Sequence, residues 1–228
     1  MSPSFILKQA LEKGLSLISI TDHNTIEHSL LACQISQEEN IKVIPGTELT
    51  SREEVHLLAY FDNILALIEL GNIINQLLPK MKNKPEFFGY QVQYDNSGEI
   101  VDLDYRLRQT SINMSLEQLV EEIHRLNGLA IPAHIDKNRF SLISQLGFID
   151  SEAVFDAVEV SKYKWNKNKY QLGDILSGFP LICGSDSHYP DDIGLFYMKT
   201  ENDQLMDYHC FKKYLKERKY ENNRRPSV

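Results

Sequence analysis

Histidines and acidic residues follow several apolar runs of this sequence, at the point where each run stops. A histidine after one strand is usually a hydrogen-bonded loop residue, and a single aspartate often caps a turn. Together, these side chains supply imidazole nitrogens and carboxylate oxygens, which zinc, manganese and iron bind. They are Asp22 and His23 in "ISITDHNT", Glu48 in "VIPGTEL", His134 in "AIPAHID", and Asp186 and His188 in "LICGSDSH".

This set of ligand types suits phosphoryl chemistry. A bridging carboxylate such as Glu48 would hold two cations about 3.5–4 Å apart, and bound cations lower the pKa of a water to roughly 7. In-line attack on phosphorus then needs position and charge from the protein. Lys137 and Arg139 follow His134 and are placed to bind a phosphate. No serine or cysteine has a neighbouring base, so we assign no side-chain nucleophile.

The elements that must position these residues alternate between strand and helix patterns. The alternation predicts a parallel sheet with crossover helices, and a closed barrel fits it better than an open sheet. The carboxyl ends of barrel strands converge on one mouth. Strands are expected at 15–20, 41–46, 55–60, 129–133, 155–160 and 180–184, and helices from Pro3 to before Gly14, at about 25–39, 63–78, 115–127 and near 203–218.

Two segments stand outside this alternation. "DNSG" lies between two runs rich in Val, Tyr and Ile, which predicts a β-hairpin. We therefore interpret 84–112 as an insertion on a single domain that spans 1–218. The polar residues 219–228 are expected to form a disordered tail.

Composition bounds the classes of protein that fit. The chain has 228 residues, 42% of them hydrophobic, and a net charge of −8, which disfavours nucleic acid and anionic membranes as partners. Its three cysteines have no paired spacing, and no apolar run is long enough to span a membrane, so we expect a cytoplasmic protein. Cys33, Cys183, His28, His124 and His209 are expected to be structural or solvated rather than ligands.

Five stretches carry a resemblance to a known family. "ISITDHNT", "IPGTE", "VHLLAY", "IPAHID" and "CGSDSH" occur in the order seen in the polymerase and histidinol phosphatase (PHP) family of metal-dependent phosphoesterases, which the chain resembles from about residue 3 to 200. The resemblance implies a distorted seven-stranded (β/α) barrel, TIM-like, with two or three divalent metal ions (Zn, Mn or Fe). Asp22 would orient a ligand or bound water. The implied metal ligands are His23, Glu48, His56, His134, Asp186 and His188, of which His56 rests on the resemblance alone.

The chain departs from this family at its start. The family opens with a strand that carries a His-x-His pair, and an acidic ligand commonly follows soon after. This sequence begins at Met1, at the cap of the helix that should come next. A barrel without its first strand leaves two unpaired edges. Three explanations are open: a true start upstream of Met1, a truncated relative that has lost catalysis, or a partial metal site with weakened activity.

The resemblance and the residues together predict a hydrolase. We expect it to cleave a phosphoester of a small molecule or nucleotide with a metal-activated water. One alternative is a catalytically impaired or regulatory PHP relative. Another is a nuclease or polymerase-associated PHP module, which the net charge of −8 disfavours. The basic stretch 162–170 is expected either to add charge at the mouth or to form a solvated loop.

Overall fold

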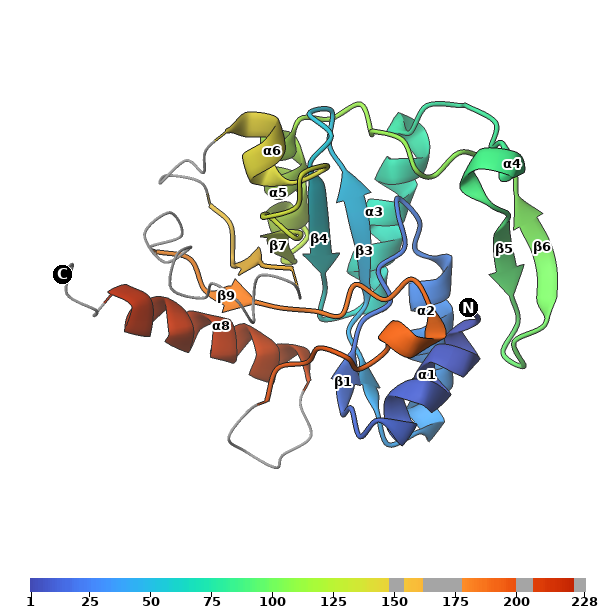
Figure 1. Cartoon of the computed structure of the whole chain (residues 1–228), viewed down its shortest axis with the longest axis horizontal. Coiled ribbons are helices and arrows are strands. Elements are labelled where there is room, and N and C mark those ends of the chain that lie inside the picture. The colour runs from blue at the N-terminus through green and yellow to red at the C-terminus, as the bar shows by residue number, and fades with distance from the viewer. Residues whose placement is uncertain (148–153, 162–177, 200–206, 224–228) are drawn as a thin grey trace.

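The computed structural model describes residues 1–147, 154–161, 178–199 and 207–223 (Figure 1). The expected basic stretch 162–170 lies outside these residues. The elements are α1 (Pro3–Glu12), β1 (Leu17–Ile18), α2 (Glu27–Ile35), η1 (Ser36–Glu38), β2 (Lys42–Val43), β3 (Gly46–Thr50), β4 (His56–Tyr60), α3 (Ile64–Leu77), α4 (Pro85–Phe88), β5 (Gln91–Tyr94), β6 (Ile100–Asp104), α5 (Leu116–Arg125), β7 (Leu129–Pro132), α6 (Leu142–Leu146), β8 (Val158–Glu159), β9 (Leu181–Ile182), η2 (Pro190–Asp192) and α8 (Tyr208–Asn223).

The helix starts follow from capping residues that the sequence displays. Ser2 accepts a hydrogen bond from the backbone N–H of Phe5, and Asn63 caps α3 in the same way. Ser115 and Gln118 form a reciprocal capping box at the start of α5, as its sequence pattern predicts. The last helix continues to Asn223, so the polar segment expected as a tail begins as helix, and 224–228 lie outside the described residues.

The central sheet corrects the prediction of a parallel sheet. Strands β3, β4 and β7 pair in that order, and both pairings are antiparallel. A short turn, 51–55, joins β3 to β4, and only antiparallel neighbours accept so short a connection. The structure is mixed α/β, and no sheet closes on itself among the described residues. Among the described residues, β1 pairs parallel with β2 and β8 with β9, and an isolated parallel bridge joins His23 to Glu48.

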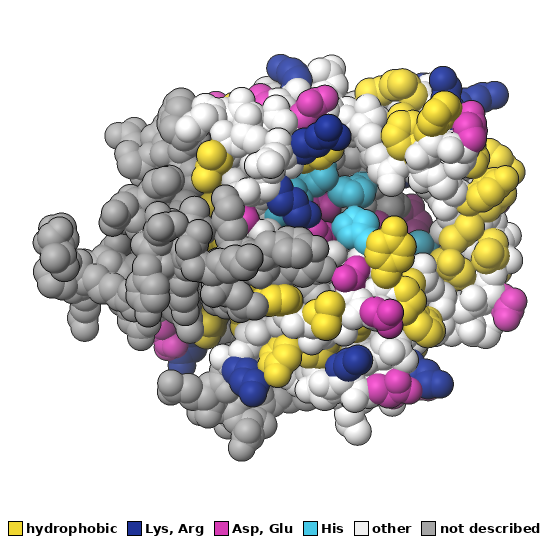
Figure 2. All heavy atoms as spheres, viewed as in Figure 1, with side chains coloured by type: hydrophobic (Ala, Val, Ile, Leu, Met, Phe, Trp, Pro, Cys, Tyr) yellow, Lys and Arg dark blue, Asp and Glu magenta, His cyan; other side chains and the backbone are white. Residues whose placement is uncertain are grey.

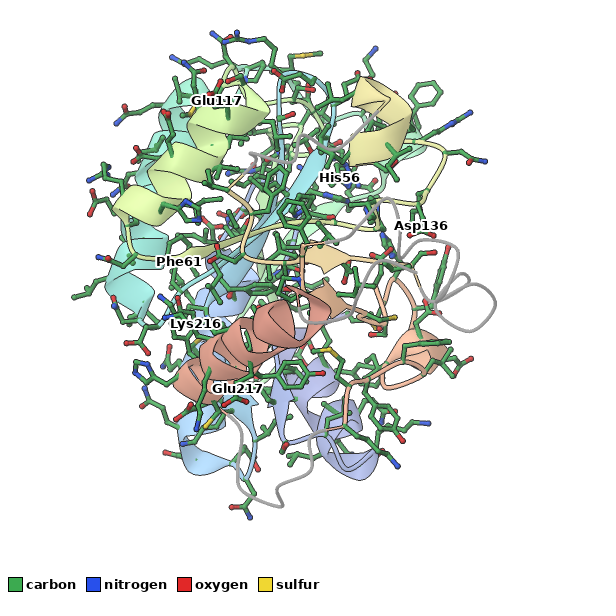
Figure 3. All side chains as sticks on the ribbon, turned by 90° about the vertical axis from the view of Figure 1, so that its left-hand side faces the viewer. His56, Phe61, Glu117, Asp136, Lys216 and Glu217 are labelled. Carbon is green, nitrogen blue, oxygen red and sulfur yellow. The ribbon has the colours of Figure 1, made fainter. Side chains whose placement is uncertain are left out.

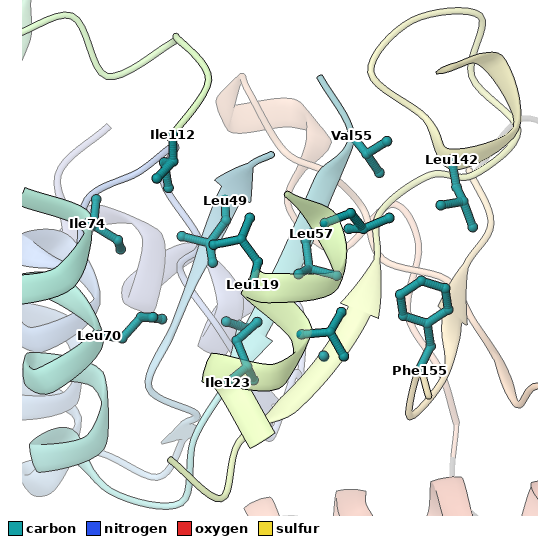
Figure 4. Packing of buried hydrophobic residues seen from close by; sticks show 14 of the residues in the cluster. Leu49, Val55, Leu57, Leu70, Ile74, Ile112, Leu119, Ile123, Leu142 and Phe155 are labelled. Atoms are coloured by element: carbon teal, nitrogen blue, oxygen red, sulfur yellow. The ribbon is translucent and has the colours of Figure 1, made fainter. Parts of the chain in front are cut away.

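Side-chain alternation along the central strands separates two cores. Leu57 and Ala59 of β4 face the layer formed by α3 and α5, where they pack in a cluster with Leu70 and Ile123 (Figure 4). Leu58 points to the opposite face, into a second cluster that α8 covers. Glu48 is the cross-strand partner of Leu58, so its carboxylate lies on this second face, away from the helical layer.

The predicted hairpin is present. β5 and β6 pair antiparallel and project beside the main body at the right of Figure 1, with an irregularity between Gln93 and Tyr94. Within the parts of the chain that the structure describes, no helix is both long and apolar enough to cross a membrane.

Candidate metal centre

Three imidazoles surround the carboxylate of Glu48. One oxygen, Oε2, lies 3.1 Å from His23 Nδ1. The other, Oε1, lies 3.2 Å from His56 Nδ1 and 3.4 Å from His134 Nε2. The rings of His56 and His134 approach each other, with 3.3 Å between Nδ1 of the first and Nε2 of the second. We call His23, Glu48, His56 and His134 the Glu48 cluster.

Each member of the cluster comes from a different element. Glu48 lies within β3, not just after a strand as the sequence pattern predicted, and His56 is the first residue of β4 (Figure 3). His23 is held beside Glu48 by backbone bonds, because the N–H of Glu48 donates to Asp22 and the N–H of Asn24 donates back to Glu48. The loop after β7 carries His134.

Two unusual backbone positions fix the cluster. Asn24 has φ 50° and is fully buried, and its side chain donates to the carbonyls of Arg108 and Thr110 and accepts from Thr50 N–H. His134 has φ 29°, a left-handed conformation that non-glycine residues seldom adopt. Such positions persist only where the surrounding contacts hold them, and they concentrate at functional sites.

The charge states of the cluster suit a cation. Burial acts to raise the pKa of Glu48, but contacts from His134 and His56 and the charge of His23 outweigh it and hold that pKa well below its ordinary value. Burial lowers the pKa of His23, since the imidazolium is poorly solvated there. At neutral pH the cluster therefore pairs an ionised carboxylate with a neutral imidazole, the protonation states in which both bind metals.

The geometry passes a direct test of fit for a metal ion. Single ligand atoms of His23, Glu48 and His56 all lie within 4.8 Å of one another. His134 Nδ1 is buried and has no hydrogen-bond partner among the described residues, and the buried His23 Nδ1 lies 3.1 Å from Glu48 Oε2 without hydrogen-bond geometry. Buried ring nitrogens without a partner are costly in a purely structural role and are expected where a cation binds. The Glu48 cluster fits a divalent metal.

A large cavity opens beside the cluster. Its volume is about 1150 Å³, and His23, Glu48, Asp186 and His188 all contribute to its wall. Figure 2 shows histidine side chains gathered in a hollow on this face, with acidic side chains around them. β1 and β9 also border the cavity.

Several solved structures have a fold similar to that of this chain. Endonuclease Q from Pyrococcus furiosus superimposes with a TM-score of 0.61 over 95% of this chain at 16% identity. A Bifidobacterium adolescentis protein assigned as a metal-dependent phosphoesterase superimposes with a TM-score of 0.56 at 18% identity. The alignment covers 95% of this chain and 91% of that protein. An amidohydrolase from Chromobacterium violaceum superimposes with a TM-score of 0.59, also at 18% identity. The alignment covers 96% of this chain and 92% of the amidohydrolase. The chain shares its fold with these three proteins.

The chain spans about half of the length of endonuclease Q, 51% of that chain. At the level of sequence, it is 37% identical to the uncharacterized protein MJ1587 of Methanocaldococcus jannaschii over 51 residues, which are 22% of this chain and 30% of MJ1587. No family model matches the sequence.

Of the remaining residues expected at the site, Asp186 and His188 line the cavity, whereas Lys137 and Arg139 are not among the described residues that line it. Asp186, with φ 46°, pairs with the ammonium of Lys137. His188 Nδ1 lies 3.6 Å from Asp186 Oδ1, and its side chain is 62% exposed. Arg139 is exposed to solvent. The structure thus gathers three of the expected ligands around a fourth, Glu48, and puts the other two on the wall of the adjoining cavity.

Several contacts at the site could not be predicted from the sequence patterns. The ring of Phe140 stacks on His56 with centroids 4.9 Å apart. Glu159, buried at 8% exposure, accepts the backbone N–H of His134 at 3.1 Å. The sequence around Glu159, "FDAVEV", predicts a strand and gives no sign of a role at the site. Asp22, expected to orient a ligand, has its carboxylate 2.5 Å from Nδ1 of His28.

His28 connects Asp22, beside the cluster, to the β5–β6 hairpin. His28 Nε2 lies 2.9 Å from the carbonyl oxygen of Val92 in β5. The contact with Asp22 is the main reason that the pKa of His28 is raised, against the opposing effect of burial. The expectation that His28 is structural agrees with these two bonds.

Replacing His28 by Phe should weaken the attachment of the hairpin while keeping an aromatic ring at this position. Loss of the bond to Val92 costs about 1 kcal/mol, so local opening of 91–104 should become roughly fivefold more frequent. Amide hydrogen exchange of these residues measures it. His124→Phe is the matched control, since His124 Nε2 bonds to Asp156 instead. Equally faster exchange in both variants would contradict a role for the His28–Val92 bond in holding the hairpin.

Proposed function

We propose that this chain hydrolyses a phosphoester with divalent cations bound at the Glu48 cluster. The observation that carries the proposal is a buried carboxylate within 3.4 Å of three imidazole nitrogens, at the wall of a cavity large enough for a small substrate. The PHP-like fold supports it, since a solved protein of this fold is assigned as a metal-dependent phosphoesterase.

The proposed ligand set extends beyond the cluster. Two or three Zn, Mn or Fe ions would be held by the six residues His23, Glu48, His56, His134, Asp186 and His188. Bound cations polarise the phosphoryl oxygens and lower the pKa of a water molecule. Shared placement on the cavity wall supports the inclusion of Asp186 and His188.

Lys137 and Arg139 are proposed to bind the phosphate. The ammonium of Lys137 now pairs with Asp186. A cation bound at Asp186 would compete for that carboxylate, and the ammonium would then turn to the phosphate oxygens. Asp22 would act on the site through the backbone, because its carbonyl accepts the N–H of Glu48 at 3.2 Å.

The distorted seven-stranded barrel also remains a proposal. The parallel pairs β1–β2 and β8–β9 support it, because residues of β1, β8 and β9 line the same cavity.

A nuclease is the second candidate function. The observation that favours it is the fold shared with endonuclease Q, which has been solved in complex with a 27-mer duplex that has an abasic lesion at the active site, with a TM-score of 0.62 at 17% identity. The net charge of −8 opposes it and favours a small phosphorylated substrate. DNA affinity that falls steeply with salt would favour the nuclease.

Metal titration followed by hydrolysis assays tests the proposal. We expect the metal-free chain to bind at least one Mn²⁺ or Zn²⁺ tightly and then to hydrolyse small phosphomonoesters, with activity lost again in chelator. Tight binding without hydrolysis of small esters or DNA would instead favour a catalytically impaired or regulatory relative. Failure to bind either metal would overturn the proposal.

A further inference from the structure

An exposed tyrosine, Tyr90, borders the cavity beside β5. All five residues from Tyr90 to Tyr94 contribute to its wall, and the Tyr90 residue is 73% exposed. Figure 2 shows hydrophobic side chains gathered over the region of α4, β5 and β6. Large apolar groups at a cavity mouth are seldom left in water without a binding role.

The strand that follows Tyr90, β5, is held in place. Besides the bond from His28 to Val92, the side chain of Gln91 accepts the backbone N–H of Arg108 at 3.0 Å. The ring of Tyr94 packs 5.4 Å from that of His28. Tyr90 immediately precedes this strand, which runs from Gln91 to Tyr94. A ligand would therefore meet a fixed surface.

This wall offers flat apolar area rather than positive charge. Arg108, the cation bonded to β5, is already bound by the carboxylate of Asp104 at 2.6 Å and by the carbonyl of Asn24 at 3.1 Å. A second phosphate or a bare sugar would gain little here. A planar ring would gain a stacking surface, while its phosphate lay at the Glu48 cluster.

We propose that Tyr90 determines specificity by stacking on the base of a nucleoside monophosphate. The inference rests on the proposed phosphoesterase function, for which it names the substrate class. Tyr90 shares one cavity of about 1150 Å³ with His23 and Glu48 of the cluster, a volume large enough for a nucleotide. Stacking needs only the π-face of a base, so either purines or pyrimidines fit.

The test compares AMP with ribose 5-phosphate, which differ by the base alone. We expect kcat/KM for AMP to exceed that for ribose 5-phosphate by roughly 10-fold, within the range that a stacked base contributes. Tyr90→Ala should remove this advantage, mainly through KM, because stacking is equal in ground and transition states. Phe87→Ala is the matched control: Phe87 lies in the same insertion, is 76% exposed and does not line the cavity.

Binding to the metal-free protein separates this inference from the proposed function. Saturation-transfer NMR should show contact from the protein to the base protons of AMP, and Tyr90→Ala should abolish it even if neither ester is hydrolysed. Hydrolysis of both esters with equal efficiency would overturn the inference and leave the function intact. Equal losses in Tyr90→Ala and Phe87→Ala, or no contact with the base in the wild-type protein, would overturn it as well.

Discussion

Replacing Glu48 by Gln is expected to weaken binding of Mn²⁺ or Zn²⁺ by more than about 100-fold. Residues that only orient a metal ligand change affinity by roughly 10–100-fold, and Glu48 is placed to bind the metal itself. The substitution keeps the size of the side chain but removes the negative charge that faces three imidazoles. Isothermal titration of the metal-free variant with each cation measures the loss, and hydrolysis should fall with it.

Glu159→Gln provides the matched control for this experiment. Both glutamates are buried, at 7% exposure for Glu48 and 8% for Glu159, so both variants exchange a buried carboxyl group for an amide. The carboxylate of Glu159 contacts the backbone of His134 rather than its ring. Metal affinity should therefore change far less in the control. Equal loss in both variants would show that burial of charge, not ligation, governs the affinity.

The sequence was sufficient to find the residue types of the site but not their geometry. Glu48 was identified because it follows an apolar run, yet it lies inside β3, whose pairing with β4 is antiparallel. A pattern of apolar residues shows where a strand lies and leaves the direction of its partner open. His56 required the family resemblance, since it begins its strand, whereas the strand-end argument selects only residues that follow one.

The supporting residues could not be predicted because their partners lie far away in the sequence. Asn24 bonds to the carbonyls of Arg108 and Thr110, beyond the whole of α3 and the hairpin. Glu159 reaches His134, 25 positions earlier. Local propensity carries no information about such contacts. The capped helices α3 and α5 could be predicted, since Asn63 and Ser115 bond within their own first turns.

Glu159 should make the stability of the metal-free chain depend on pH. Burial raises its pKa from 4.5 to about 7, helped by the negative charges of Glu48 and Asp186 and opposed by the N–H of His134. The folded state thus binds the proton more tightly than the unfolded state. Its contribution to the free energy of unfolding is present below about pH 4.5 and is lost as the pH rises to about 7. The loss amounts to about 3 kcal/mol.

Glu159→Gln isolates this contribution because glutamine does not titrate. Urea unfolding at pH 4 and pH 8, after removal of metal, should show the variant gaining about 3 kcal/mol relative to the wild-type chain as the pH rises. Glu99→Gln, at an exposed position, controls for loss of a surface carboxylate. Parallel curves for Glu159→Gln and the wild-type chain would mean that Glu159 is solvated in the metal-free protein. In saturating Mn²⁺ the difference should shrink, since nearby cations favour the ionised carboxylate and offset the cost of its burial.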